Sequence, residues 1–124
     1  MTQGKGWIGV DLDGTLARYD GWVNELHIGA PVPAMLERVK AWLAEGREVR
    51  IFTARVADGA GNRSRYSPSV IRCGIENWCL EHIGQALPVT CSKDFGMIAL
   101  YDDRCVQIER NTGRALGQEE LIRP

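Results

Sequence analysis

Residues able to do chemistry come directly after apolar runs in this 124-residue chain. Asp11 and Asp13 follow the first run with one residue between them, so in an extended segment their carboxylates fall on the same side. Later runs are followed or preceded by a hydroxyl, further carboxylates and basic residues, namely Thr53, Arg55, Lys93, Asp102 and Asp103. The repetition of such residues beside apolar runs is the signal, since each of them alone is common.

These side chains suit phosphoryl transfer assisted by a divalent cation. Several carboxylates gathered in one place repel one another, and a hard cation such as Mg²⁺, which prefers oxygen ligands, relieves that repulsion. With the cation in place, one carboxylate can attack phosphorus, while a second protonates the leaving oxygen and later deprotonates water. Thr53 and Lys93 could hold the transferred oxygens and neutralise their developing charge.

The elements that must position these residues alternate along the chain. Short apolar runs predict strands at 7–10, 49–52, 87–90 and 97–101. Helices are expected from about Pro33 to Glu45 and from Ser67-Pro68 to Gly84, because proline suits a first helical turn and glycine a helix end. This alternation favours an α/β domain with a mainly parallel sheet, in which ligands bind beyond the carboxyl ends of the strands. The candidate residues are therefore expected at one edge of the sheet.

One domain spanning residues 1–124 is expected from the length. Residues 16–31, which contain two glycines and a proline, predict an irregular or hairpin-like excursion. Residues 57–66 predict a polar loop. Alternation at 106–108, followed by Asn111-Thr112-Gly113, predicts a small C-terminal hairpin.

Composition narrows the class of protein. The net charge of −1 gives no global field that would hold the chain on nucleic acid or anionic lipid, although a local basic patch stays open. No apolar run approaches the roughly 20 residues of a membrane span, so no membrane association is expected. The four cysteines form no C-x-x-C pair, which favours reduced thiols in a cytoplasmic protein over disulfides or a zinc site.

In order and setting, the motifs resemble those of the haloacid dehalogenase (HAD) superfamily of phosphotransferases, over nearly the whole chain. Asp11-Leu12-Asp13-Gly14-Thr15 is similar to the first family motif, Thr53 to the second, Lys93 to the third and Asp102-Asp103 to the fourth. The resemblance implies a Rossmann-like three-layer sandwich with the first-motif strand between those of the second and fourth motifs. Residues 16–31 would then be the family's flap.

The resemblance also implies catalytic roles. Asp11 would be the nucleophile that forms an aspartyl-phosphate, and Asp13 would be the general acid and base. Thr53 would bind the phosphoryl oxygens, and Lys93 would hold both the nucleophile and the phosphate. The implied reaction is the hydrolysis of a phosphomonoester.

Metal binding is implied in the same way. The Asp11 side chain, the Asp13 main-chain carbonyl and Asp102 would bind Mg²⁺, with Asp103 contributing through water or by orienting a ligand. Oxygen ligands alone do not separate Mg²⁺ from Mn²⁺ or Co²⁺. Arg55 is a further candidate for contact with the substrate phosphate, and a salt-bridging role for it is equally open.

Departures from the family pattern bear on the substrate. Neither the segment after Thr15 nor the one between Thr53 and Lys93 is long enough for a folded cap, which indicates a capless member with an open site. Open sites often accept phosphate on a macromolecule, unless a second subunit of a homo-oligomer covers them. Thr53-Ala54-Arg55 and Asp102-Asp103-Arg104 are similar to the phosphatase domain of phage-type polynucleotide kinases, which implies a nucleotide or a nucleic-acid 3′-phosphate.

Two other classes of function compete with a phosphatase. A catalytically weak HAD scaffold that binds a phosphorylated ligand or a protein partner is the main alternative. A phospho-acceptor domain of the response-receiver kind is disfavoured, because its acidic pair precedes the acceptor aspartate, whereas Asp102-Asp103 follows Asp11.

Overall fold

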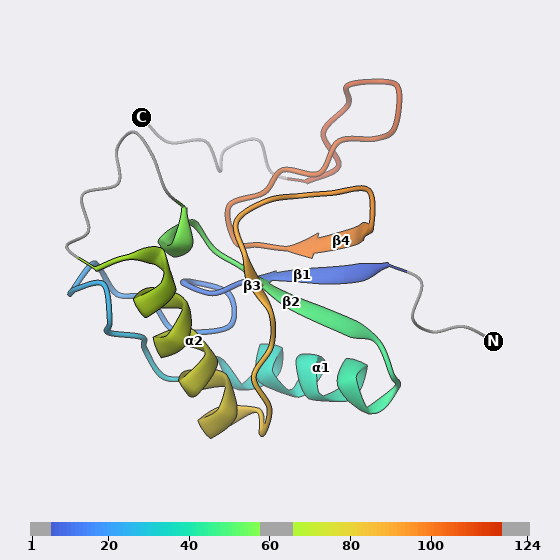
Figure 1. Ribbon diagram of the computed structural model, residues 1–124. Coiled ribbons are helices and arrows are strands. Elements are labelled where there is room, and N and C mark those ends of the chain that lie inside the picture. The colour runs from blue at the N-terminus through green and yellow to red at the C-terminus, as the bar shows by residue number, and fades with distance from the viewer. Residues whose placement is uncertain (1–5, 58–65, 118–124) are drawn as a thin grey trace.

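A four-stranded sheet forms the centre of the computed structural model, which describes residues 6–57 and 66–117 (Figure 1). The elements in chain order are β1 (Trp7–Asp11), α1 (Pro33–Ala44), β2 (Glu48–Phe52), the short 3-10 helix η1 (Ala54–Val56), α2 (Pro68–His82), β3 (Val89–Thr90) and β4 (Met97–Tyr101). The strand order is β3-β2-β1-β4, and every pair is parallel. The predicted α/β fold with a Rossmann-like parallel sheet is confirmed.

The register of the sheet brings the candidate residues to one edge. β1 lies between β2 and β4, with Asp11 paired to Phe52 on one side and Val10 to Tyr101 on the other. The chain therefore leaves β1, β2 and β4 at the same level. Since the strands are parallel, the residues that follow them meet at their shared carboxyl edge.

Both helices begin and end where local chemistry favours it. Pro33 and Pro68 occupy first-turn positions, where the missing N–H of proline costs no hydrogen bond. The Ser67 hydroxyl accepts a hydrogen bond from the Val70 N–H at 3.3 Å and caps α2. Gly46 and Gly84 follow the two helices in left-handed conformations, with φ of +86° and +103°.

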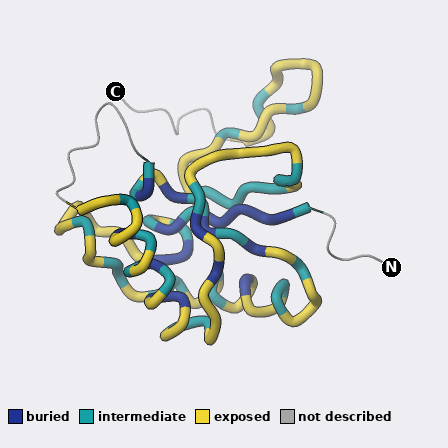
Figure 2. Tube along the Cα trace, in the orientation of Figure 1, coloured by how far each residue is buried: buried dark blue, intermediate teal, exposed yellow. Residues whose placement is uncertain are grey.

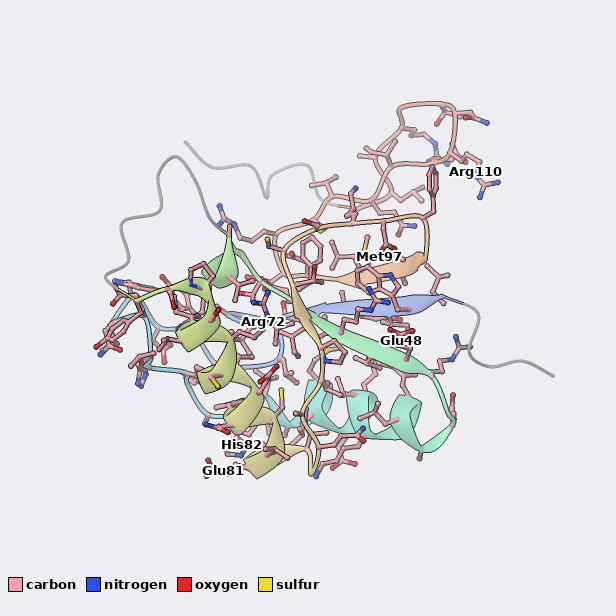
Figure 3. The ribbon with its side chains drawn as sticks, in the orientation of Figure 1. Glu48, Arg72, Glu81, His82, Met97 and Arg110 are labelled. Atoms are coloured by element: carbon pink, nitrogen blue, oxygen red, sulfur yellow. The ribbon has the colours of Figure 1, made fainter. Side chains whose placement is uncertain are left out.

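The apolar core lies between the sheet and the two helices. Figure 1 shows α1 and α2 on the same side of the sheet, and Figure 2 shows the buried residues running along β1 at the centre. Between α2 and the sheet, Arg72 donates from Nε to the Val89 carbonyl oxygen of β3 at 3.4 Å, and Figure 3 labels this side chain. The core is formed by Ile8, Val10, Leu12, Leu16, Val39, Val49, Ile51, Ile71, Ile75 and Cys79, among others.

The opposite face of the sheet carries no helix in the described residues. The connection from β3 to β4 has only residues 91–96, too few for a helix of useful length. Trp7, which is 1% exposed, fills this face instead, with the Arg50 guanidinium 4.4 Å from its ring. Its Nε1 donates to Asp94 Oδ1 at 2.8 Å and ties the connection to β1. The predicted third layer is thus replaced here by side chains and the connection itself.

Two irregular segments match their predicted character. Residues 16–31 are joined at the base by a bridge between Ala17 and Pro31, and Trp78 of α2 donates to the Gly29 carbonyl oxygen at 3.0 Å. The C-terminal hairpin is reduced to one antiparallel bridge, Ile108 to Ala115, around a turn that contains Asn111 at φ +66°. Most of the predicted loop at 57–66 lies outside the described residues. Within the described ranges, no helix has the length and apolarity needed to cross a membrane.

The Trp7 contacts generate a prediction about stability. Trp7→Phe keeps an aromatic ring but removes the N–H donor and leaves space around a buried side chain. We expect the free energy of unfolding to fall by about 1–2 kcal/mol, as measured by urea denaturation followed by circular dichroism. Trp22→Phe is the matched control, since Trp22 is 57% exposed, and should change stability by less than about 0.5 kcal/mol. Equal stability of Trp7→Phe and wild type would contradict this account.

Candidate active site

A cleft of about 1040 Å³ opens at the carboxyl edge of the sheet. All of the predicted site residues except Lys93 line it. The full lining comprises Asp11, Asp13, Tyr19, Trp22, Glu25, Phe52, Thr53, Ala54, Arg55, Ile71, Asp102, Asp103 and Arg104. The predicted convergence of β1, β2 and β4 on one site is therefore present.

Three carboxylates form the acidic centre of the cleft. Asp11, Asp102 and Asp103 each offer an oxygen within 4.8 Å of the other two. The Thr15 hydroxyl oxygen lies 3.2 Å from an oxygen of Asp11 and 3.2 Å from one of Asp103, and it accepts from the Asp103 N–H at 3.0 Å. Thr15 therefore joins the end of β1 to the turn after β4.

Gly14 permits this close approach. Its φ of +91° is a left-handed conformation that disfavours other residues, and a Cβ on it would lie 2.6 Å from Asp103 Oδ2. The role of Thr15 was not predicted as such. The signal was available, because Thr15 is the hydroxyl residue that immediately follows this glycine.

Crowding changes the chemistry of Asp11. Burial raises the pKa of Asp11 to about 8, assisted by the negative charge of Asp102 and by the hydrogen bond with Asp103. Without a cation, the three groups therefore do not all carry full charge at neutral pH. This donor set of hard carboxylate oxygens fits Mg²⁺.

Asp13 belongs to a different arrangement. Both of its oxygens accept from Arg55, from Nε at 2.7 Å and from Nη2 at 2.9 Å. Arg55 also donates to the carbonyl oxygens of Glu25 at 3.0 Å and His27 at 2.8 Å, and its side chain is 7% exposed. Arg55 therefore forms the salt bridge that was the open alternative for it, and its predicted contact with the substrate phosphate stays a prediction.

Thr53 lies at the floor of the cleft and is 3% exposed. Its N–H donates to the Thr90 carbonyl oxygen at 2.9 Å, which fixes the end of β2 against β3. Its hydroxyl oxygen accepts from the Arg55 N–H at 3.1 Å and caps η1. The position suits the predicted contact with phosphoryl oxygens, which stays a prediction.

Lys93 lies outside the cleft lining and is exposed. It is near enough to Cys105 to oppose the rise that partial burial, Asp102 and the other aspartates cause in the pKa of the Cys105 thiol. Lys93 therefore lies near Cys105 rather than among the residues that line the cleft. Its role in holding the nucleophile and phosphate stays a prediction.

Two aromatic residues of the segment 16–31 form a wall that was not predicted as a unit. Tyr19 is 48% exposed and Trp22 is 57% exposed, and both line the cleft. The Trp22 ring packs on the Arg55 guanidinium, 5.2 Å from the ring centroid. Aromatic residues in an otherwise irregular, glycine-containing segment were the available signal.

Comparison with known proteins supports the fold alone. No protein-family model and no curated protein matches the sequence. Among solved structures, the fold is similar to that of a conserved protein from Bacteroides thetaiotaomicron, with a TM-score of 0.54 and 21% identity. The match covers 82% of this chain and 78% of that one.

The raised pKa of Asp11 predicts how stability depends on pH. Between the ordinary value of 3.8 and about 8, the folded protein without metal binds more protons than the unfolded chain. The free energy of unfolding contributed by this group therefore falls as pH rises through that window and levels off above it. Asp11→Asn removes the effect, so with chelator present its Tm should exceed that of wild type at pH 9 by about 4 °C or more.

Thermal unfolding in EDTA at pH 5 and pH 9 measures the difference, which should be markedly smaller at pH 5, where only part of the window between the two pKa values has been crossed. Glu37→Gln, an exposed position on α1, makes the same change of charge away from the cleft and should follow wild type at both pH values. A Tm difference for Asp11→Asn that is the same at pH 5 and pH 9 would contradict the assignment.

Proposed function

We propose that this protein is a phosphomonoesterase that depends on a divalent cation and uses Asp11 as its nucleophile. The observation that carries the proposal is the partly buried Asp11 carboxylate, which lies beside Asp102 and Asp103 at the end of the central strand. Thr53 and Asp13 line the same cleft. The order of these motifs along the chain, which resembles that of the HAD superfamily, supports the same reaction.

Mg²⁺ fits the carboxylate oxygens of the cleft. The side chains of Asp11 and Asp102 would hold it, with Asp103 and the main-chain carbonyl of Asp13 completing the set from this chain. When bound, the cation neutralises the carboxylates and the phosphate oxygens, so that two anions can approach each other.

In the first step, an Asp11 carboxylate oxygen attacks phosphorus and the bond from phosphorus to the ester oxygen breaks. Asp13 gives its proton to the leaving oxygen, which departs as an alcohol. The phosphoryl group is then joined to Asp11 as an acyl phosphate. Thr53 stabilises the transferred oxygens through its hydroxyl group.

In the second step, water attacks the same phosphorus and passes a proton to Asp13. The bond between phosphorus and the Asp11 oxygen breaks, which restores the carboxylate and releases inorganic phosphate. Asp13 ends the cycle protonated, as it began. Each step therefore uses the same residue, first as acid and then as base.

The shape of the cleft bears on the substrate. A volume of about 1040 Å³ is far larger than a phosphate group needs, and Tyr19 and Trp22 give one wall a flat apolar surface. This supports a phosphate ester with a sizeable organic group, such as a nucleotide or the 3′ end of a nucleic acid. The cytoplasmic location and the homo-oligomer that could cover the cleft stay predictions.

Phosphate release across a substrate panel tests the proposal. The panel contains 3′- and 5′-phosphorylated oligonucleotides, nucleotides, sugar phosphates, phosphopeptides and an aryl phosphate, each with Mg²⁺ and with chelator. We expect turnover that requires metal and falls by at least about 1000-fold in Asp11→Asn, since the nucleophile is lost.

Glu37→Gln, again the control for charge, should keep wild-type activity. Rapid quenching of wild type with radiolabelled substrate should trap a phosphoenzyme that hydroxylamine cleaves, as an acyl phosphate requires. Turnover retained by Asp11→Asn would rule out the mechanism. Tight binding of phosphate esters without turnover by wild type would favour the binding scaffold.

Calorimetry of Mg²⁺ binding gives a prediction that does not depend on turnover. Because the pKa of Asp11 without metal is about 8, Asp11 is largely protonated at pH 7, and binding should release about one proton. Titrations in buffers with different ionisation enthalpies measure this number, which should fall toward zero at pH 9. Asp11→Asn should bind more weakly and release no proton, whereas Glu37→Gln should match wild type. Binding without proton release at pH 7 would contradict the predicted role of Asp11 as a ligand.

A further inference from the structure

Arg55 makes four hydrogen bonds from its guanidinium to two different parts of the chain. Two of them reach the Asp13 carboxylate after β1, and two reach the main-chain oxygens of Glu25 and His27 in the segment 16–31. The side chain is 7% exposed, so water competes little for these bonds. Arg55 thus connects the candidate acid and base to the segment that walls the cleft.

The geometry of the pair holds the plane of the Asp13 carboxylate. Each Asp13 oxygen accepts one N–H, at 2.7 Å and 2.9 Å, in the side-by-side arrangement that a planar guanidinium imposes. A carboxylate oxygen has a second lone pair, so each Asp13 oxygen keeps one that is not used by Arg55, and one of these would carry the proton that Asp13 gives to the leaving oxygen. Orientation matters here because proton transfer to a leaving oxygen requires direct hydrogen-bond contact.

Arg55 is itself held from three directions. The main-chain N–H of Arg55 donates to the Thr53 hydroxyl oxygen at 3.1 Å, which anchors Arg55 to the end of β2. Its guanidinium lies 5.2 Å from the centroid of the Trp22 ring, on the cleft wall. The remaining contacts are those to Asp13 and to the carbonyl oxygens of Glu25 and His27. A displacement of the segment 16–31 would therefore move the guanidinium that orients Asp13.

We propose that Arg55 is the positioning residue for Asp13, and that it couples the orientation of this carboxylate to the position of the segment 16–31. The inference rests on the proposed function for the catalytic role of Asp13. In this role, Arg55 acts on the reaction through Asp13 and not through direct contact with the substrate phosphate. Lysine retains the charge but not the planar fork, so Arg55→Lys separates positioning from simple charge.

The test compares kcat/KM for two classes of substrate that differ in their need for an acid. An alkyl phosphate has a poor leaving group and needs the proton from Asp13, whereas 4-nitrophenyl phosphate has a good leaving group and needs it little. Because kcat/KM reports the steps up to release of the alcohol, the later hydrolysis of the phosphoenzyme does not enter. We expect Arg55→Lys to lose about tenfold or more with the alkyl ester and less than about threefold with the aryl ester.

Asp13→Asn should show the same selectivity with a larger loss for the alkyl ester. Arg50→Lys is the matched control, because Arg50 lies on β2, outside the cleft lining, where it pairs with Glu48 at 2.7 Å and lies over the Trp7 ring. It should keep the wild-type ratio between the two esters. Equal losses for both esters in Arg55→Lys would indicate contact with the substrate phosphate and overturn the inference.

Hydrogen–deuterium exchange gives a second readout that needs no turnover. The amides of Leu26 and His27, which donate to Asn24 Oδ1 at 2.9 Å, should exchange at least about tenfold faster in Arg55→Lys than in wild type, with the rest of the chain unchanged and Arg50→Lys like wild type. Unchanged exchange in that segment would overturn the inference. If wild type hydrolyses no ester while the exchange rises as expected, the proposed function fails and the link from Arg55 to the segment 16–31 is retained.

Discussion

The site depends on the crowding of carboxylates where parallel strands end. β1 is the central strand of the candidate site, so the residue that ends it, Asp11, meets the turn that leaves β4. Gly14 leaves space for Asp103, and Thr15 bridges the two sides through its hydroxyl group. In water these carboxylates would separate. The sheet keeps them within 4.8 Å and makes a bound cation electrostatically favourable.

The negative charge of the two groups of acidic residues is compensated in different ways. Asp13 is compensated within the protein by the guanidinium of Arg55, which both neutralises and orients it. Asp11, Asp102 and Asp103 have no comparable basic partner among the described residues that line the cleft, and burial together with mutual repulsion raises the pKa of Asp11. The Asp13 carboxylate is therefore compensated and oriented by the chain itself, whereas a bound cation would be needed to favour the ionised form of Asp11 at neutral pH.

Apolar periodicity was sufficient to predict the strands and helices and the edge at which Asp11, Thr53 and Asp102 meet. It was insufficient for contacts that involve the main chain. The hydrogen bonds from Arg55 to the carbonyl oxygens of Glu25 and His27 cannot be predicted from residue types, because every residue carries a main-chain carbonyl group. The absence, among the described residues, of a helix on the second face of the sheet was likewise missed, since the family resemblance implied a third layer that the six residues between β3 and β4 are too few to build. Lys93 was predicted to join the other candidate residues, but it lies outside the cleft lining, and its predicted role stays a prediction.

The large separation in sequence between β1 and β4 also affects when the acidic centre can assemble during folding. Thr15 and Asp103 are 88 positions apart in the chain, and Trp7 and Asp94 are 87 apart. Closing such long loops costs entropy before any contact compensates it, so docking of β4 is expected late on the folding route. An intermediate made of β1, α1, β2 and α2 would bury most of the apolar core and still hold Asp11 without its acidic neighbours. Such an intermediate would be compact and nearly complete in its core, yet would lack the cluster of three carboxylates.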